Sequence, residues 1–492
     1  MYDWGMPSHP LQTPQVKDCI FLDPVQACAQ ARLRQRVEQT PSVSGLQVCY
    51  YVGDEVIGDP PENLVQVRPA DFVEFMARTR YRLPTKMDFT KETVARARQL
   101  APLSEQAAAL RQKLFTEAVT AYSRRPRRQR QPNERLRVLA VTSRTTTVMQ
   151  HCSRAILEAF ARLGVETHLV IESSEMEAHD GTTAILSHLK FDPDLVFNIN
   201  RIANQFLPSD VANVVWWQDP FQNLAREKSV RWRENDLLYS IASQLVPDLV
   251  AETGLAEGRA RIQPFCIDRR RFCLDEKTVR KNKVVFVGNA AHLGLTHTAA
   301  ERACLSELIH RLEAGEATSN QELISIGARY GFSANQTIHY ISYFVMRDHI
   351  VRWICQTPGI DVEIYGQFWE QDPVVAPFHR GVLPHGEAVA DVYRSAKYAL
   401  VLHPFSINSQ RLGEVGACGC IPVIYDCRFQ ADLPHWEDLA LYFRTRQGLA
   451  ECLRSDRITA PDRFAEKFDY DNFARRILQD AAPYLGPLPL EI

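Results

Sequence analysis

The chain has 492 residues, of which 45% are hydrophobic and 24% charged, and its formal net charge is −2. This length allows two or three domains with full-sized cores, and the composition is that of an ordinary globular protein. A nearly neutral chain has no general field that attracts nucleic acid or anionic membranes, so we expect neither as a partner. No apolar run approaches the roughly 18 residues of a membrane span, and the start MYDWGMPSHP has no signal-peptide pattern. We therefore expect a cytoplasmic protein without an integral membrane segment.

The 12 cysteines are scattered, and several lie inside apolar segments, such as Cys49, Cys304 and Cys355. This distribution favours buried thiols in a reducing compartment over a disulfide framework. Cys418-x-Cys420, with Cys427 nearby, is the closest approach to a metal motif. The spacing does not match a zinc site and no histidine is placed with it, so we expect no metal.

Residues 1–122 are predicted to form an accessory region with short strands at 19–22 and 46–52 and helices at 71–80 and 90–122. Nothing in this region forms a recognisable chemical constellation. The segment SRRPRRQRQP follows, with five arginines and two prolines, and we interpret 123–135 as a basic linker. Blocks of like charge with proline usually stay extended between domains; a phosphate-binding or partner-docking patch is the alternative.

Apolar runs alternate with amphipathic helices from residue 136 to about 270, which predicts a parallel sheet covered on both faces. The loop SRTTTVMQH after the first run contains no G-x-G-x-x-G, which disfavours a dinucleotide-binding dehydrogenase. The strands of this first series are predicted at 136–141, 166–171, 194–198, 213–217, 237–241 and 261–264.

A second series occupies 271–492, after the joint PFCIDRRRF at 264–272, and a last helix is predicted at 469–481. Residues 299–355 are helical in pattern and are predicted as an insertion in this second domain. A helix-turn-helix reader of DNA is the alternative, but the second helix is apolar with few cations, which favours a buried helix. The strands of this series are predicted at 283–288, 362–365, 398–402, 421–425 and 439–442.

The segment SQRLGEVGACGCIPVIY at 409–425 predicts a short helix that ends at Gly419 and feeds a buried strand. Arg411 and Glu414 lie three residues apart on one face of that helix. The free N–H groups of a helix start suit a diphosphate, and an acidic residue one turn further along can accept hydrogen bonds from a ribose diol. A surface ion pair between the two residues is the alternative.

The pattern Arg411-x-x-Glu414-x-x-Ala417-Cys418-Gly419, followed by Pro422-Val423, resembles the donor-site signature of GT-B glycosyltransferases of the group 1 type. It is most similar to the spore-maturation CgeB-like group, whose pattern is R-x-F-E-x-x-A-C-G. The joint resembles the interdomain stretch P-x-x-x-D-x-x-x-F, and VFVGNAAH at 285–292 resembles the first strand and loop of the nucleotide domain. The resemblance covers roughly 136–481. Two departures are Gly413 in place of phenylalanine and Ser406 in place of a second glutamate.

The resemblance implies an α/β protein with two Rossmann-like domains, one for the acceptor (136–270) and one for the nucleotide-sugar donor (271–492), with the last helix returning to the first. Ligands in such folds bind beyond the carboxyl ends of the strands. Arg302 is expected either to neutralise the diphosphate or to face solvent. His403 is expected to be either a donor contact or an ordinary loop histidine. The donor residues that we predict are Gly288, Asn289, Arg302, Tyr365, Gly366, His403, Asn408, Ser409, Gln410, Arg411 and Glu414.

On the acceptor side, Asp219 in VVWWQDPFQ and His151 in TTTVMQHCSR both follow predicted strands. Inverting transfer needs a general base, and either residue could serve. The Asp219-Pro220 pair matches the D-P of the CgeB-like group, although Asp before Pro also forms turns.

The function that this resemblance implies is a metal-independent glycosyltransferase of hexosyltransferase type. It would use a nucleotide sugar as substrate, no cofactor, and a protein or glycan acceptor. A non-catalytic GT-B-like module that binds a nucleotide sugar or a partner is the alternative, because of Ser406. A sugar-nucleotide epimerase on the same plan is disfavoured by the lack of an epimerase motif.

Overall fold

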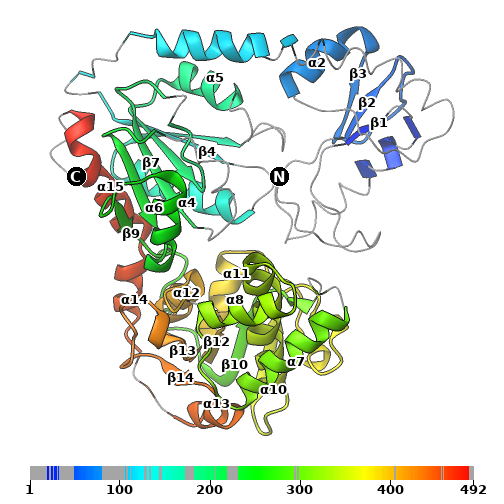
Figure 1. The fold of residues 1–492 in the computed structure, drawn as a ribbon, viewed down its shortest axis with the longest axis vertical. Helices are drawn as coiled ribbons and strands as arrows, with labels where there is room; N and C mark the ends of the chain where they lie inside the picture. The colour runs from blue at the N-terminus through cyan, green and yellow to red at the C-terminus, as the bar shows by residue number, and fades with distance from the viewer. Residues whose placement is uncertain are drawn as a thin grey trace.

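Within the residues described by the computed structural model there are three parallel sheets, two of them in the large lobes seen in Figure 1. The structure describes residues 19–21, 49–79, 112–126, 134–142, 147–171, 182–204, 207–218, 231–292, 298–403, 406–455 and 459–486, with a few short pieces between them.

The first lobe is built on a six-stranded sheet with the order β5-β4-β6-β7-β8-β9, and all neighbours pair in parallel. Each strand begins and ends within two residues of its predicted position. The three central strands are buried along their whole length, which explains why they are continuous apolar runs. The strands are β4 (Arg137–Thr142), β5 (Glu166–Ile171), β6 (Leu195–Ile199), β7 (Ala212–Trp217), β8 (Asp236–Ser240) and β9 (Ala260–Ile262).

Alternate residues of these strands serve two different cores. Val214 and Trp216 of β7 pack with α4 (Thr147–Arg162) and α15 (Tyr470–Leu485) on one face. Val215 and Trp217 pack on the other face with Leu249 of α6 (Val246–Thr253). Further along that second face, α5 (Thr182–Phe191) and the helix that includes 112–122 cover β4 to β6.

The second lobe has a five-stranded parallel sheet with the order β11-β10-β12-β13-β14. One face packs on α7 (Ala299–Glu313), α8 (Asn320–Arg329), α10 (Ile350–Cys355) and α13 (Arg446–Cys452). The other face packs on α11 (Glu387–Ser395), α12 (Gln410–Ala417) and α14 (Pro461–Phe468). The two parallel sheets confirm the predicted α/β fold with two Rossmann-like domains. The strands are β10 (Lys281–Val287), β11 (Asp361–Tyr365), β12 (Ala396–Val401), β13 (Ile421–Tyr425) and β14 (Leu441–Phe443).

Residues 299–355 are helical, as the pattern predicts, but they do not pack as a separate subdomain. They form the crossover from β10 to the neighbouring strand β11, and their apolar side chains share one core with the sheet. The alternative of a DNA-reading helix therefore loses its support, because the helix that would enter a groove is buried. The elements are α7 (Ala299–Glu313), α8 (Asn320–Arg329), α9 (Ala334–Gln336), π-helical turns at Thr337–Ile341 and Phe344–His349, and α10 (Ile350–Cys355).

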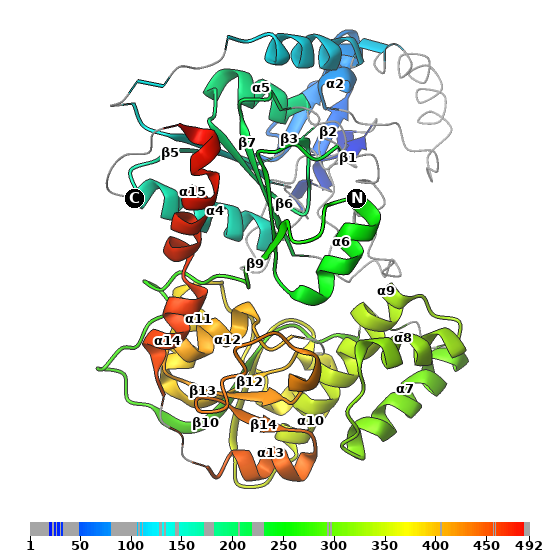
Figure 2. The ribbon, with the colours of Figure 1, turned by 60° about the vertical axis from the view of Figure 1, so that its left-hand side comes forward.

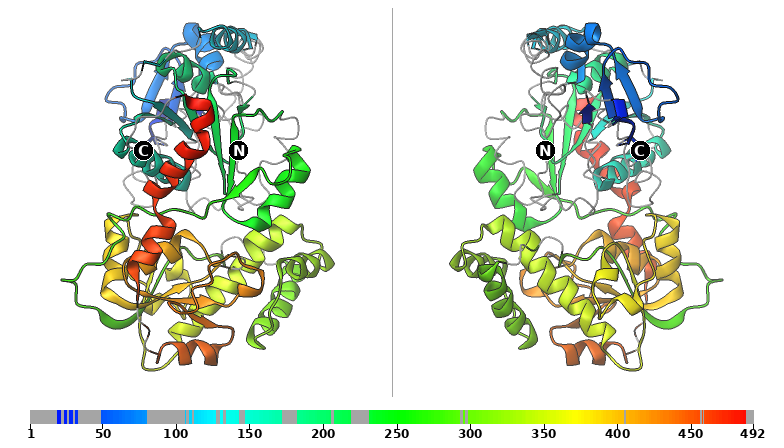
Figure 3. Two further views of the ribbon diagram at one scale, coloured as in Figure 1. Left: turned by 90° about the vertical axis from the view of Figure 1, so that its left-hand side faces the viewer. Right: turned by 90° about the vertical axis from the view of Figure 1, so that its right-hand side faces the viewer.

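The chain passes between the lobes twice, and the two passages touch. The backbone N–H of Ile267 in the joint donates to the carbonyl of Phe468 at 2.7 Å, and Tyr470 N–H returns a bond to Ile267 at 3.4 Å. Beyond this point α15 runs alongside the first sheet, as Figures 2 and 3 show, and contributes Phe473, Ile477 and Leu478 to its core. The expectation that the last helix returns to the first domain is confirmed.

The accessory region holds a small parallel sheet, β1 (Cys19–Phe21), β2 (Cys49–Val52) and β3 (Leu64–Val67), followed by α2 (Phe72–Thr79). β3 was not predicted from the sequence. Most of 90–111 in the second predicted helix lies outside the described residues, while 112–122 is helical. The domain boundaries stay predictions.

Arg125, in the segment 123–135 that is predicted as a basic linker, packs against the first lobe. This side chain is only 10% exposed and forms ion pairs with Asp192 at 3.2 Å and Asp210 at 3.3 Å. Arg130 also donates to the carbonyl of Leu485. Arg125 is held here because the first lobe supplies two carboxylates, which the sequence pattern alone does not reveal.

Candidate functional site

The candidate site lies where the strand order of the second sheet reverses. The first strand of this lobe, β10, lies between β11 and β12, so the chain leaves it in opposite directions across the sheet. In such sheets the loops at the carboxyl ends separate at this point and leave a crevice for a ligand. The loop after β10, which begins at Gly288, and the start of α12 meet there.

The sequence of α12 determines where the helix starts and ends. Ser409 is the N-cap, and its hydroxyl accepts a bond from the N–H of Leu412 at 3.4 Å. The helix ends at Ala417, and Gly419 takes the left-handed conformation with φ of 72°, which favours glycine. The free N–H groups at the start of this two-turn helix therefore face the crevice end of the sheet.

The departure from the family pattern at Gly413 has a structural reason. A Cβ atom at Gly413 would lie 2.8 Å from the ring of Phe468, and one at Gly416 would lie 2.3 Å from the ring of Phe464. Both phenylalanines belong to α14, which packs directly on α12. The two glycines allow this close approach, and a phenylalanine at position 413 has no space in this chain.

Glu414 is buried, with its side chain 8% exposed, and its oxygen Oε1 is held by two donors. Gln410 Nε2 donates to it at 2.9 Å, and His385 Nε2 lies 3.0 Å away. The other oxygen, Oε2, accepts no hydrogen bond from the described residues. The alternative of a surface ion pair with Arg411 is wrong, because Glu414 is inside and its charged partner is His385.

Arg411 points across the sheet to the loop after β10. Its Nε donates to the carbonyl of Val287 at 2.9 Å, and its guanidinium lies 5.1 Å from the ring centre of Phe286. A Cβ at Gly288 would be 2.8 Å from Nη2 of Arg411, so only glycine lets the arginine come this close.

Arg347 is a candidate that the sequence analysis missed. It comes from the crossover helices, donates through Nη1 to the carbonyl of Asn289 at 3.0 Å, and lies over the ring of Tyr343. Burial, followed by the charge of Arg411, lowers the pKa of Arg347, so the two guanidinium groups are close enough to repel. These two guanidinium groups lie beside a helix start, and within the described residues neither forms an ion pair, so the environment favours an anion. In the sequence Arg347 was only one of two cations on an apolar helix, which gave no signal of this position.

The buried side chain of Asp348 holds the loop after β10 in place. Its buried carboxylate accepts bonds from the N–H groups of Ala291 and His292, each at 2.9 Å. The Asp348 hydrogen bond outweighs the effect of burial and raises the pKa of His292. Two adjacent residues of one helical turn thus bind the same loop: Arg347 donates to one of its carbonyl groups, and Asp348 accepts from two of its N–H groups.

Two other predicted residues fasten the loops to each other. Asn289 Oδ1 accepts from the N–H of Gln367 at 2.9 Å. Gly366 has a φ of 136°, and a Cβ there would lie 2.2 Å from the carbonyl oxygen of Gly288. These contacts join the carboxyl ends of β10 and β11.

The remaining predicted donor residues lie in less direct positions. Tyr365 donates its hydroxyl to Glu363 at 2.9 Å, and His403 lies 3.3 Å from the hydroxyl of Tyr343. Asn408 holds the 432–436 loop through both ends of its amide, which is a structural role. Arg302 is exposed on α7.

On the acceptor side, the structure places His151 in the second turn of α4, whereas the sequence analysis placed it in the loop after the strand. Its ring centre lies 5.1 Å from that of His385, so it approaches the second lobe. Burial, followed by the charge of His385, lowers the pKa of His151, which keeps this imidazole neutral near neutral pH. A neutral imidazole is the form that a general base requires. Asp219 lies outside the described residues.

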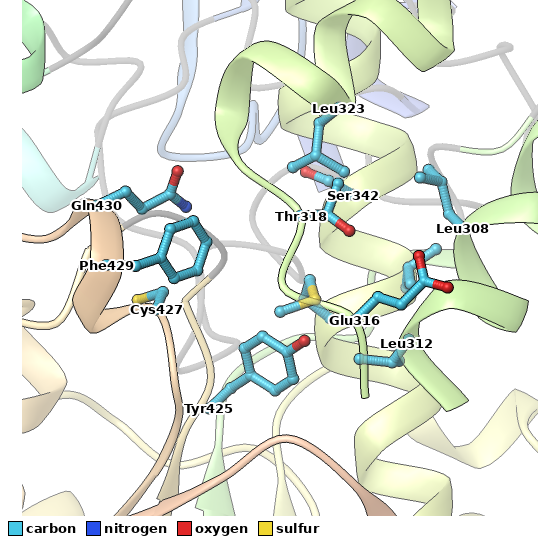
Figure 4. A pocket seen from close by; sticks show the side chains of 12 residues that line it. Leu308, Leu312, Glu316, Thr318, Leu323, Ser342, Tyr425, Cys427, Phe429 and Gln430 are labelled. Carbon is cyan, nitrogen blue, oxygen red and sulfur yellow. The ribbon is translucent and has the colours of Figure 1, made fainter. Parts of the chain in front are cut away.

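A small pocket seen in Figure 4 is distinct from this site. It encloses about 30 Å³ between the crossover helices and the segment after β13, which is room for about two waters. Tyr425, Phe429 and Gln430 line one side of it. None of the predicted donor residues lines it, and it is too small for a nucleotide sugar.

Within the described part of the chain, no three His, Cys, Asp or Glu side chains are grouped as metal ligands. The cysteines resolved there are free thiols, and most of them are buried. No helix among these residues is both long and apolar enough to cross a bilayer.

Residues 347–479 match a protein-family model described as glycosyl transferase-like. The matched segment begins at Arg347 and includes His385, Arg411 and Glu414, so the glycosyltransferase-like part of the chain contains the core of the candidate site. A search of curated proteins by sequence found no match.

Several solved glycosyltransferase structures resemble the fold over about 70% of the chain. Sucrose-phosphate synthase from Thermosynechococcus elongatus is 11% identical and has a TM-score of 0.43, with 70% of this chain and 98% of that chain covered. AviGT4, a glycosyltransferase of avilamycin A biosynthesis, is 14% identical with a TM-score of 0.40, covering 71% and 98%. A glycosyltransferase from Rickettsia africae is 8% identical with a TM-score of 0.40, covering 72% and 100%. These scores are too low to infer an activity.

Proposed function

We propose that the protein is a glycosyltransferase that moves a sugar from a nucleotide-sugar donor to a protein or glycan acceptor. The observation that carries this proposal is the arrangement at the switch point of the second sheet. The start of α12, Arg411 and Arg347 supply positive potential at one place, and Glu414 has one oxygen without a partner among the described residues. The family match over the same segment supports it.

In this proposal the diphosphate of the donor lies against the α12 start and the two guanidinium groups. Glycosyl transfer from a nucleotide sugar needs stabilisation of the charge that develops on the leaving diphosphate, and fixed cations provide it. The ribose lies one turn further along α12, where Glu414 Oε2 can accept from its hydroxyls. Glu414 and the two arginines thus recognise different parts of one ligand.

The finer features are also proposals. They are a hexosyl donor, membership of the CgeB-like group, a cytoplasmic location, transfer without a metal, and inversion with Asp219 or His151 as base. The lowered pKa of His151 supports its candidacy. Transfer that persists in the presence of EDTA would support metal independence, and loss of transfer that Mg²⁺ or Mn²⁺ restores would exclude it.

The second candidate is a non-catalytic module that binds a nucleotide sugar, and Ser406 in place of the second glutamate is the observation that favours it. A panel of nucleotide sugars tested by thermal shift identifies the donor, because a ligand at 100 times its Kd stabilises the folded protein by about 2.7 kcal/mol. Release of nucleoside diphosphate from the best ligand then separates the two functions. An enzyme releases it in proportion to protein concentration, and a binding module releases none.

A further inference from the structure

His385 contacts three parts of the molecule at once, although no sequence motif marks it. It lies in the segment that precedes α11, and its side chain is 38% exposed. Its ring lies 5.1 Å from that of His151 in the first lobe and 5.7 Å from that of Phe272 in the joint. Its Nε2 lies 3.0 Å from Glu414 Oε1.

These contacts define the direction of the Glu414 carboxylate. A glutamate has several rotatable bonds, and two donors from different segments, Gln410 and His385, converge on the same oxygen. With Oε1 held in this way, rotation about the last bond is restricted and the position of Oε2 is set. Second partners of this kind commonly orient a binding group that touches the ligand itself.

We propose that His385 is a positioning residue of the donor site: together with Gln410 it holds one oxygen of Glu414, so that the other oxygen receives the ribose hydroxyls of the nucleotide. The proposal rests on the proposed function and goes one step further, because it assigns a role to a residue outside the donor motif. It also gives the site a titratable cation close to where an anionic ligand binds.

The electrostatics around His385 agree with this role. The groups that face it are Glu414 of α12, His151 of α4 and Arg271 of the joint. Burial by itself lowers the pKa of His385, but the hydrogen bond and charge of Glu414 outweigh burial, and the net shift is upward. The pKa of the neighbouring His151 moves downward. Of the two imidazoles, His385 is therefore the one that takes up a proton first as the pH falls.

Donor binding should consequently take up protons. The bound diphosphate adds negative charge near His385 and raises its pKa further, so the fraction of protonated His385 increases at pH values between the free and bound pKa. By linkage, donor affinity falls as the pH rises through this window. A side chain with a purely structural role would show no such coupling.

The experiment is calorimetry of the full chain with the nucleoside diphosphate of the best donor, between pH 6 and 9, in buffers of different ionisation heat. His385→Gln keeps an N–H donor but does not titrate. His385→Phe keeps the ring contacts with His151 and Phe272 but has no donor. We expect Gln to bind within about threefold of the wild type without proton uptake, and Phe to bind roughly tenfold more weakly. His310→Gln, an exposed histidine of α7, is the matched control and should keep both affinity and proton uptake.

The proposal is overturned if His385→Phe binds as tightly as the wild type, or if proton uptake persists in His385→Gln. Thermal unfolding of each variant shows whether it is folded. If His385→Phe does not fold, proton uptake by His385→Gln decides whether the proposal holds. A wild-type protein that binds no nucleotide would overturn the proposed function and this inference together. A wild type that binds, and loses binding with Glu414→Ala but not with His385→Phe, would overturn the inference alone.

Discussion

Glu414 is the residue on which donor recognition should depend most directly. Replacing it by Ala removes charge-assisted hydrogen bonds worth roughly 1.5–3 kcal/mol, which corresponds to about a 10- to 150-fold loss of affinity for the nucleoside diphosphate. Because the carboxylate is buried and bonded to His385, we also expect a lower melting temperature, which Glu414→Gln should reduce less. Calorimetry on folded protein checks the affinity. Unchanged binding by Glu414→Ala would exclude the ribose role, and Glu451→Ala, at an exposed glutamate of α13, serves as control.

Arg347 and Arg302 offer a direct comparison between structure and sequence. Arg347 faces the loop after β10, whereas Arg302 is exposed on α7. We expect Arg347→Gln to weaken nucleoside diphosphate binding by roughly tenfold, since one cation beside the diphosphate is lost, and Arg302→Gln to leave it unchanged. The free nucleoside should bind both variants equally well, because it carries no phosphate. The reverse ranking would show that the diphosphate lies elsewhere.

Asp219 and His151 are tested by one variant and one product analysis. If the enzyme inverts and Asp219 is the base, Asp219→Asn should lower turnover by ~10²- to 10⁴-fold while donor binding stays intact. A retaining reaction needs no such base, so the loss should be much smaller. NMR of the product anomer identifies the stereochemistry. An inverted product from a fully active Asp219→Asn enzyme would make His151 the first candidate.

Among the contacts between secondary-structure elements, the packing of α12 on α14 can be tested most directly. Restoring the family residue by Gly413→Phe forces a ring into the space that Phe468 occupies, and we expect it to destabilise the protein by about 1–3 kcal/mol or more. Phe468→Ala in the same chain should recover part of this loss. A double-mutant cycle of denaturant unfolding measures the coupling. Strictly additive effects would show that the two side chains do not compete for the same space.

The elements themselves were largely predictable, and their physical properties explain why. Buried parallel strands such as β7 and β13 are unbroken apolar runs, so their ends are visible in the sequence. The four residues of β3 have two exposed side chains between two buried ones, which is too short a pattern to recognise.

The site was predictable only where one continuous segment builds it. The helix start, Arg411 and Glu414 belong to a single motif, and the structure places Arg411 and Glu414 on α12 as expected, with Ser409 as its N-cap. Arg347 and His385 come from the crossover and from the segment before α11, and only the sheet topology brings them to α12. No spacing of residues within a single segment predicts that these two side chains lie beside α12. Gly413 shows the opposite case, since a departure from the motif was visible but its cause, Phe468, lies 55 positions further along the chain.

At the scale of the whole molecule, the last helix belongs structurally to the first lobe. Phe473, Ile477 and Leu478 are buried against the first sheet, and each contributes roughly 1.5–3 kcal/mol. Their sum is comparable to the whole stability of a typical domain, about 5–15 kcal/mol. We therefore expect a chain that ends at residue 469 to have an unfolded first lobe. A chain that ends at residue 486 should remain intact.

Limited proteolysis with mass spectrometry distinguishes the outcomes. In the chain that ends at residue 469, cleavage sites should appear within β4 to β9, while β10 to β14 stay protected. Equal protection of both sheets would mean that the first lobe does not need α15. Cleavage throughout both lobes would mean that they do not fold independently.

The position of α15 also affects the order of events during synthesis. The ribosome finishes β8 at Ser240. The helix α15, which packs on one face of β8, is complete only at Leu485, about 245 residues later. At roughly 5–20 residues per second this delay lasts about 12–50 s, during which the nascent first sheet lacks part of its core. The second lobe emerges in that interval and is complete once α14 ends at Phe468, before α15, so we expect the second lobe to become stable before the first. Pulse proteolysis of stalled nascent chains would show this inverted order, and chaperones that bind exposed apolar strands should associate with chains stalled between these two points.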